Sequence, residues 1–426
     1  MEKADETKPD VAPGLLARVR RISVDISPLK NSPDYRRLWS ASLVSYLGSF
    51  LTAVAVPYQV YELTGSTAAV GLIGLVELFP LLLLSLVGGA IADAVDRRKL
   101  LLITESLTAA SSLGLAYNAS LDDPHVWLLF VLAGANAAMY ALGTPAFRSL
   151  TPLFVKTDDL SAAAALSGMS RTLSAVAGPA VAGVLLATVG LTRTYLFDAV
   201  SFLAILVAVF RMRPVPVSSD EDRFTFKSIL DGVRFLRGRP VLQGSFIVDI
   251  IAMVFGMATA LFPAVAAELG GPQVLGLLYS APYAGALVAS LTSGWTARVH
   301  RHGLIVYLAV AGWAISLIVF GMSNTLWLTL SALAGAGASD MISAIFRSTI
   351  LQTAAPPNMI GRLSGLELAV VTSGPSIGDI EAGLLAAATS VRFAIVAGGV
   401  ACLAGIALMT VFLPQFALYD SRDPTP

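Results

Sequence analysis

The chain has 426 residues, of which 56% are hydrophobic and 13% charged, and its mean hydropathy is +0.75. These values exclude an ordinary soluble domain and indicate a polytopic membrane protein. The formal net charge is zero, so charge offers no argument for nucleic-acid binding. The single cysteine, Cys402, excludes an internal disulfide and a thiolate metal cage, and we expect no catalytic residues, no metal site and no cofactor.

The N-terminal residues 1–37 are polar and lack the short apolar core of a signal peptide, so we expect a cytoplasmic tail. Apolar stretches long enough to cross a bilayer follow, which predicts an all-α integral membrane protein with twelve transmembrane helices. The predicted spans lie near residues 38–61, 67–92, 100–120, 126–146, 161–188, 192–210, 241–267, 273–297, 304–322, 326–346, 363–388 and 393–413.

The basic residues predict the orientation of these spans. A cytoplasmic N-terminus places all of the 28 Lys and Arg residues in cytoplasmic segments except Arg171, Arg193 and Arg392. Such a bias in short loops sets membrane topology. Both termini, including the tail 414–426, are therefore expected in the cytoplasm.

The turn between the second and third spans, GGAIADAVDRRK at 88–99, combines small, acidic and basic residues. Gly89 permits close approach of another helix, and Asp93, one helical turn later, is placed to cap a helix or pair with an arginine. Together with Arg97 and Arg98, these residues predict a cytoplasmic gate.

A basic segment at 213–240 separates two predicted six-helix bundles, 38–212 and 241–413. The bundles are pseudo-symmetric, since AFRSLTPLF at 146–154 resembles IFRSTILQT at 345–353. Such parallel repeats are typical of transporters whose halves rock about a central site. Within the basic segment, KSILDGVRFLR reads either as a surface helix, with Ile229, Val233 and Phe235 inward, or as a solvated linker.

Acidic residues within the spans are functional hypotheses, because a charge inside the membrane is costly. Burial favours the neutral form of a carboxyl group and suits it to carry protons, although structural pairing is the alternative for each. All three histidines fall in loops, so a proton relay must use carboxylates. Arg171 is expected to pair with an acid of a neighbouring span. The acids are Glu77, Glu105, Asp198, Asp249, Asp340, Asp379 and Glu381.

Several motifs resemble the major facilitator superfamily, and within it the enterobactin exporter branch of siderophore and drug efflux proteins. GGAIADAVDRRK resembles the superfamily's loop motif, with Asp96 where many members carry glycine. GPAVAG resembles the exporter motif of the fifth helix through Gly178, Pro179 and Gly183, with Ala182 replacing the first glycine of the usual final pair. The branch-specific matches are SPDYRRLW at 32–39, AVPYQVYELTGS at 55–66, ASLTSGW at 289–295 and LQTAAPPNMIGRLSGL at 351–366.

This resemblance implies that spans one, four, seven and ten line a central cavity. Asp249 and Asp340 are then the first candidates for proton coupling. Asp379 and Glu381 are the next candidates; they follow GPSIG, a predicted glycine-flanked break near the outer end of span eleven, and either close an outer gate or face water. The cavity is expected to be aromatic, with few positive charges, and lined by Tyr46, Tyr58, Asn136, Tyr140 and Phe255.

The expected function is secondary active transport by alternating access, with a proton gradient driving export of a siderophore or similar amphipathic small molecule. The resemblance also implies a bacterial cytoplasmic membrane as the location. The protein is expected to act as a monomer in this lipid bilayer, with cargo and protons as its other partners. Efflux of macrolides or mixed drugs is the alternative. A membrane-embedded enzyme or a sensor is a distant third, since the chain lacks histidine clusters and a nucleophile elbow. No nucleotide-binding loop sequence is present, which excludes ATP as the direct energy source.

Overall fold

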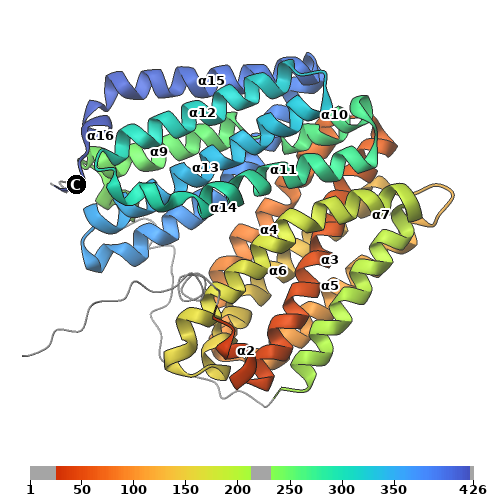
Figure 1. The fold of residues 1–426 in the computed structure, drawn as a ribbon. Coiled ribbons are helices and arrows are strands. Elements are labelled where there is room, and N and C mark those ends of the chain that lie inside the picture. Colours follow the sequence, from red (N-terminus) through yellow and green to blue (C-terminus); the bar gives the residue numbers. More distant parts are fainter. Residues whose placement is uncertain (1–24, 213–231, 423–426) are drawn as a thin grey trace, which may run out of the picture.

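The computed structural model describes residues 25–212 and 232–422, with the backbone alone for residues 85–94. Figure 1 shows the described helices in two bundles. The first bundle contains α3 (Pro33–Thr64), α4 (Thr67–Ala94), α5 (Arg97–Ala119), α6 (Val126–Phe154) and α7 (Leu160–Phe210). The second contains α9 (Pro240–Phe255), α10 (Phe262–Leu269), α11 (Pro272–Leu291), α12 (His302–Met322), α13 (Leu326–Ala354), α14 (Pro357–Ala388) and α15 (Val391–Phe412). Short helices α2 (Ser27–Asn31) and α16 (Pro414–Leu418) flank them.

The helices account for the predicted membrane spans. Within the described residues, ten segments are long and apolar enough to cross a bilayer. One of them contains α7, whose 51 residues would extend about 77 Å at 1.5 Å per residue, enough for two crossings. Gly190, with a φ of 80°, divides α7 between the fifth and sixth spans. The 32-residue helix α14 is also long enough to span. These lengths accommodate the twelve predicted spans and confirm the all-α membrane fold.

Local sequence explains where several helices begin and end. Pro33 occupies the first turn of α3, and the side chain of Ser32 accepts a hydrogen bond of 3.2 Å from the backbone N–H of Tyr35. Gly65 ends α3 in the left-handed region, with a φ of 60°. The Asp96 side chain caps α5 by accepting from the backbone N–H of Arg98 at 2.9 Å. Asp96 therefore has a structural reason to stand at this turn.

The seventh and eleventh spans differ from their predicted forms. The seventh span is broken, because α9 ends at Phe255 and a short helix, η2 (Thr259–Leu261), precedes α10. The eleventh span has no break at GPSIG, since α14 is continuous through that sequence. Gly374 instead provides space for packing, because a methyl group there would lie 2.6 Å from Cβ of Met253. Glycine in this helix serves close contact with α9.

The two bundles meet along two helix pairs, α7 with α11 and α4 with α14. A methyl group on Gly276 of α11 would lie 2.3 Å from the carbonyl oxygen of Pro179, and one on Gly383 of α14 would lie 2.6 Å from that of Thr67. The Thr67 hydroxyl also donates to the Gly383 carbonyl at 3.0 Å. Figure 1 shows the bundles close together near α10 and diverging toward α2 and α16. The contacts between halves therefore concentrate at the end opposite the described chain ends.

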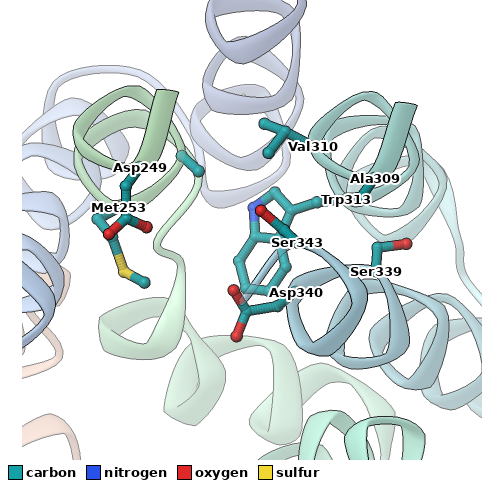
Figure 2. A pocket seen from close by; sticks show the side chains of 9 residues that line it. Asp249, Met253, Ala309, Val310, Trp313, Ser339, Asp340 and Ser343 are labelled. Atoms are coloured by element: carbon teal, nitrogen blue, oxygen red, sulfur yellow. The ribbon is translucent and has the colours of Figure 1, made fainter. Parts of the chain in front are cut away.

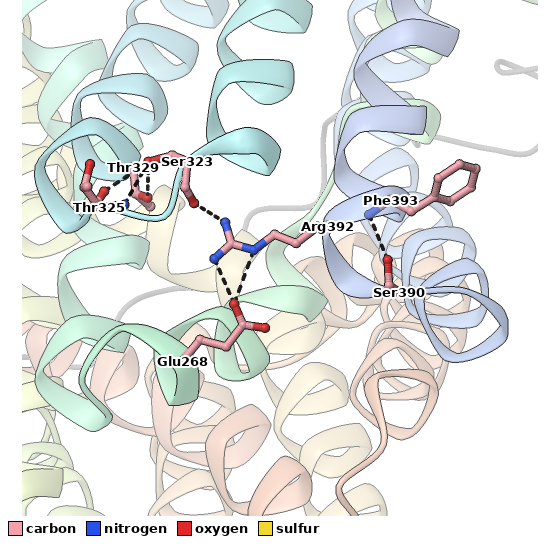
Figure 3. A network of polar contacts seen from close by, with 7 residues as sticks. All are labelled: Glu268, Ser323, Thr325, Thr329, Ser390, Arg392 and Phe393. Carbon is pink, nitrogen blue, oxygen red and sulfur yellow. Dashed lines mark hydrogen bonds and ion pairs between the residues drawn. The ribbon is translucent and has the colours of Figure 1, made fainter.

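Arg392 joins three elements of the second bundle at that end (Figure 3). Its Nη2 donates to Glu268 of α10 at 2.8 Å, and its Nη1 donates to the carbonyl oxygen of Ser323. The Thr329 hydroxyl donates to the Ser323 hydroxyl at 3.2 Å. Ser390 caps α15 by accepting from the N–H of Phe393 at 3.2 Å. Arg392, one of three basic residues outside the predicted cytoplasmic segments, thus fixes the turn between α12 and α13 against α10.

The predicted surface helix at 227–237 lies partly outside the described residues, and Ile229 is among the residues outside them. The described part is helical at 232–236. Val233 is 41% exposed, whereas Phe235 packs against the core of the second bundle. The guanidinium of Arg239 lies over the Phe235 ring, 3.6 Å from its centroid. Phe235 thus faces inward as expected, and Val233 does not.

Candidate functional site

One side of α3 faces the second bundle. Phe50 on this face contacts Tyr283 of α11, with ring centroids 6.0 Å apart, and packs closely against Gly178 of α7. Tyr46 lies one helical turn before Phe50, and Arg171 lies two turns before Gly178. Tyr46 and Arg171 therefore follow the contact between the halves toward the end where the bundles diverge.

Two arginines gather near Tyr46. The charges of Arg171, from α7, and Arg148, from α6, both act on the Tyr46 hydroxyl, as does Glu105 from α5. Both arginines are exposed, and no hydrogen bond or ion pair holds either guanidinium among the described residues. No described acid therefore pairs with Arg171. The expectation of few positive charges beside the aromatic residues fails here.

Arg148 was assigned to a cytoplasmic loop because its span was expected to end at residue 146. In the structure α6 continues to Phe154 and α13 continues to Ala354, so Arg148 and its counterpart Arg347 lie within helices. Arg148 was therefore missed as a site residue, whereas Arg171 was placed within a span and expected to have a structural role. The sequence similarity between residues 146–154 and 345–353 is the signal that could have identified Arg148.

The other predicted cavity residues occupy varied environments. Tyr140 is 64% exposed, and Phe255 is 40% exposed at the break in the seventh span. The Oδ1 atom of Asn136 is buried and has no hydrogen-bond partner among the described residues. Tyr58 donates to Glu62, one turn later on α3, at 2.6 Å. Tyr46 meets Phe147 edge-on at 6.3 Å. Of these five, Tyr46 is the residue on which both arginines act.

In the second bundle, Asp249 of α9 forms an ion pair with Arg347 of α13. Both side chains are buried, with exposures of 3% and 5%. Arg347 was assigned to a cytoplasmic segment, so its position within the bundle corrects the sequence interpretation. Structural pairing was the alternative to proton coupling for Asp249, and the structure shows this pairing. Such a pair is costly to break from one side, because the remaining charge stays buried.

A small pocket adjoins this pair (Figure 2). Asp340 of α13 faces Trp313 of α12 there, and Arg347 exerts its charge on Asp340 as well as on Asp249. Among the described residues, no hydrogen bond or ion pair fixes the Asp340 carboxylate, and the Trp313 indole N–H has no acceptor. The pocket is lined by Asp249, Ala252, Met253, Ala309, Val310, Trp313, Ser339, Asp340 and Ser343. It places a less constrained acid beside a paired one.

Asp379 stabilises the break in the seventh span. Its Oδ1 accepts from the backbone N–H of Ala260 at 2.9 Å, and its Oδ2 accepts from the Thr259 hydroxyl at 2.5 Å. These bonds satisfy the start of η2, which has no carbonyl partners in the preceding turn. The Asp379 backbone also lies against Gly71 of α4, at the contact between the halves. Glu381, two residues later, is half-buried.

The predicted gate is described in part. Gly89 and Asp93 belong to the residues whose side chains lie outside the described structure. Arg98 donates from Nε to the carbonyl oxygen of Val209 at 3.0 Å and from Nη2 to that of Phe210. These carbonyls end α7, where a cation is favourable. Arg97 is buried, with 8% exposure. In this conformation Arg98 joins α5 to α7 within one bundle.

The predicted exporter motif lies at the contact between the halves. Gly178 faces Phe50, and Pro179 presents its carbonyl oxygen to Gly276. A methyl group on Gly183 would lie 2.9 Å from Cα of Gly276. Gly276 was not predicted as a partner of this motif. The sequence PQVLG around it does not indicate which helix it contacts. The motif permits two helix backbones to approach closely.

Comparison with known proteins gives these features a family context. Residues 23–425 match the family model described as transmembrane secretion effector. The chain is 30% identical over 406 residues to the enterobactin exporter EntS of Citrobacter koseri, covering 95% of this chain and 97% of that protein. It is also 30% identical over 393 residues to the enterobactin exporter EntS of Escherichia coli O1:K1, covering 92% and 94%.

Solved transporter structures share the fold at low sequence identity. A bacterial homolog of the human lysosomal transporter Spinster, inward-facing and unoccupied, has a TM-score of 0.69 at 13% identity and covers 91% of this chain and 96% of that one. A bacterial homologue of the iron transporter ferroportin, in an inward-facing state, has a TM-score of 0.66 at 15% identity, covering 90% and 98%. These similarities concern the arrangement of the helices.

Proposed function

The chain belongs to the transmembrane secretion effector family of the major facilitator superfamily, and from this membership we propose that it exports a siderophore from a bacterial cell. It is a multi-pass membrane protein and a secondary transporter, as its family and fold establish. Two relatives that it matches over nearly their whole length are enterobactin exporters. Enterobactin or a related catecholate, which is aromatic and acidic, is the proposed cargo.

The arrangement of Tyr46, Arg148 and Arg171 is the observation that supports this cargo best. An unpaired guanidinium at membrane depth is costly, and such residues mark substrate pathways. An acidic aromatic molecule offers negative oxygen atoms to the arginines and a ring face to the tyrosine. Apolar drugs of neutral charge would leave both arginines without partners.

The proposed cycle starts from the conformation described above. With both termini in the cytoplasm, the end where the two bundles meet lies at the outer face of the cytoplasmic membrane. The diverging ends then face the cytoplasm. Cargo enters between the bundles beside Tyr46, and the bundles then rock to close behind it. The glycine contacts at Gly183 and Gly276 separate in the second conformation, and release occurs outside.

We infer that the proton gradient drives this cycle in a single polypeptide, with no cofactor. Asp340 is the preferred coupling residue of the second bundle, since Asp249 is held by Arg347. Asp379 has a capping role, which leaves Glu381 as a further candidate. Gly89, Asp93, Arg97 and Arg98 would close the cytoplasmic side when the bundles come together there.

The cargo is tested by deleting the gene in its host under iron limitation. Secreted siderophore is expected to fall and intracellular siderophore to rise, because synthesis continues while export is blocked. Tolerance to macrolides and dyes is expected to remain unchanged. Normal siderophore secretion with reduced macrolide tolerance would contradict the proposal and favour drug efflux. A copy carrying Arg193→Gln, an exposed residue outside the proposed site, serves as the control that restores export.

A further inference from the structure

Asp198 is a buried carboxylate of the first bundle that the proposed mechanism has not used. It lies on α7 between α3 and α5, and the residue is 1% exposed. Its Oδ2 accepts hydrogen bonds from the Thr52 hydroxyl at 2.5 Å and from the Ser112 hydroxyl at 2.8 Å. Its Oδ1 has no hydrogen-bond partner among the described residues. The carboxylate thus has one oxygen held and one oxygen free.

The partners of Asp198 suit a group that gains and loses a proton. A hydroxyl both donates and accepts hydrogen bonds. With Asp198 ionised, Thr52 and Ser112 donate to Oδ2; with Asp198 protonated, a hydroxyl accepts from the acid instead. The Ser112 hydroxyl has a second acceptor available, the Thr108 carbonyl at 3.2 Å. No cation pairs with Asp198 among the described residues, in contrast to the pair of Asp249 with Arg347.

Glu105 connects this buried site to the face that carries Tyr46. Glu105 is half-buried on α5, and its charge interacts with Asp198 on one side and with Tyr46 on the other. Tyr195, on α7 itself, is the other titratable neighbour, and its hydroxyl donates to Gln59 at 2.9 Å. From α3, the uncharged Thr52 binds Asp198 and Gly48 lies beside it. Glu105 is therefore the acid placed between the buried carboxylate and the diverging ends.

Helix α3 links Asp198 to the opposite bundle. A methyl group on Gly48 would lie 2.7 Å from Oδ1 of Asp198, so this part of α3 presses directly on the carboxylate. Thr52 binds Oδ2 one turn later. Phe50, between them in sequence, contacts Tyr283 across the halves. A change in the hydrogen bonding of Asp198 therefore acts on the same helical turn that touches the other bundle.

We propose that Asp198 is a proton-binding site of the first bundle, that Glu105 delivers its proton, and that its protonation state controls the contact of α3 with the opposite bundle. The proton passes from water between the bundles to the Glu105 carboxylate and then to Oδ2 of Asp198, where a hydroxyl accepts from the protonated acid; it leaves by the reverse path. This inference deepens the proposed proton-driven export, on which it rests, and adds a coupling carboxylate in the first bundle to Asp340 of the second.

The protonation of Asp198 is tested by infrared difference spectroscopy of the full-length protein in lipid nanodiscs, comparing acidic with alkaline buffer and adding no cargo. The carbonyl stretch of a protonated carboxylic acid is expected in the wild-type spectrum and is expected to be lost in Asp198→Asn. Thr52→Val is expected to shift this band, whereas Thr52→Ser retains the hydroxyl and leaves the band in place. An unchanged band in both Asp198→Asn and Thr52→Val would overturn the proposal.

The control of conformation is tested on the same samples with spin labels on the diverging ends of the bundles. The distance distribution of the wild type is expected to change with pH, and that of Asp198→Asn is expected to remain fixed. A pH response that persists in Asp198→Asn and disappears in Asp340→Asn would overturn the assignment. Thr52→Val gives the same test if Asp198→Asn does not fold. Because neither measurement includes cargo, a wrong siderophore assignment would leave both results unaffected.

Discussion

Phe50 of α3 meets Tyr283 of α11 edge-on, with ring centroids 6.0 Å apart and an interplanar angle of 73°. This pair joins the two bundles at the level where Gly178 leaves space for the Phe50 ring. Aromatic pairs in this geometry are worth about 0.5 to 1.5 kcal/mol beyond their buried area. The closed end of the molecule is held by this pair, by the close contacts of α7 with α11 and of α4 with α14, and by a hydrophobic core that both bundles share.

The closest of these contacts gives the first prediction. In Gly276→Ala, the added methyl group meets the Pro179 carbonyl oxygen at 2.3 Å, so the closed end must open. Overpacking costs about 1 to 3 kcal/mol, enough to shift the population of the two conformations roughly 5- to 150-fold. Spin-label distances across the diverging ends are expected to shorten. Gly168→Ala, on α7 with no atom near the new methyl group, is the control and is expected to leave the distances unchanged.

The buried ion pair gives a prediction about stability. Asp249→Asn leaves Arg347 charged and unpaired, and is expected to lower the free energy of unfolding by about 3 to 5 kcal/mol. Adding Arg347→Gln is expected to restore part of this loss, since partners are non-additive. Asp340→Asn, which breaks no hydrogen bond or ion pair of the described residues, is expected to unfold at nearly the wild-type temperature. Equal thermal destabilisation by Asp249→Asn and Asp340→Asn would contradict the difference assigned to these two acids.

The arginines beside Tyr46 give a prediction about binding. Arg171→Gln is expected to weaken enterobactin binding, because one hydrogen bond to a charged group contributes about 1.5 to 3 kcal/mol, or roughly ten- to a hundredfold in affinity. Calorimetry with purified protein in nanodiscs measures this. Arg193→Gln keeps the same change in net charge outside the site and is expected to bind normally. Equal affinity of Arg171→Gln and wild type would remove Arg171 from the cargo site.

Asp379 gives a prediction that separates capping from coupling. Asp379→Ala removes the acceptors for Thr259 and Ala260 and is expected to lower stability by about 0.5 to 2 kcal/mol, as for other helix caps. Asp379→Asn keeps one acceptor oxygen and is expected to retain most of the stability and proton-driven transport. Thermal unfolding and transport are measured on both variants, and Glu381→Gln is measured beside them because Glu381 is the remaining coupling candidate on α14. Loss of transport in stable Asp379→Asn would return Asp379 to the coupling residues.

The positions of the spans were predictable because each depends on local hydrophobicity. The ninth span, predicted at 304–322, is α12, His302–Met322. The break in the seventh span was not predictable, since it depends on groups far away in sequence. A methyl group on Gly256 would meet Trp313 of α12 at 2.3 Å, and Asp379 of α14 caps η2. Neither neighbour is visible in the local sequence.

The candidate site was predictable as a set of residue types and not as a set of contacts. Hydropathy identified Asp249 as a costly acid, yet its partner Arg347 fell beyond the predicted end of its span. The same error in helix length removed Arg148 from consideration. Asp198 shows the limit most clearly, because its donors Thr52 and Ser112 are 146 and 86 residues away. Uncharged hydroxyls give no sequence signal of such a site.

Proton-driven uptake of enterobactin into everted membrane vesicles tests the central claim most directly, because export from the cell becomes accumulation inside the vesicle. A pH gradient, acidic inside, is expected to drive accumulation by the wild type, and a protonophore is expected to abolish it. Asp198→Asn is expected to bind enterobactin but not to accumulate it. Accumulation by the wild type that persists without a gradient, or its absence when a gradient is imposed, would contradict proton-coupled export.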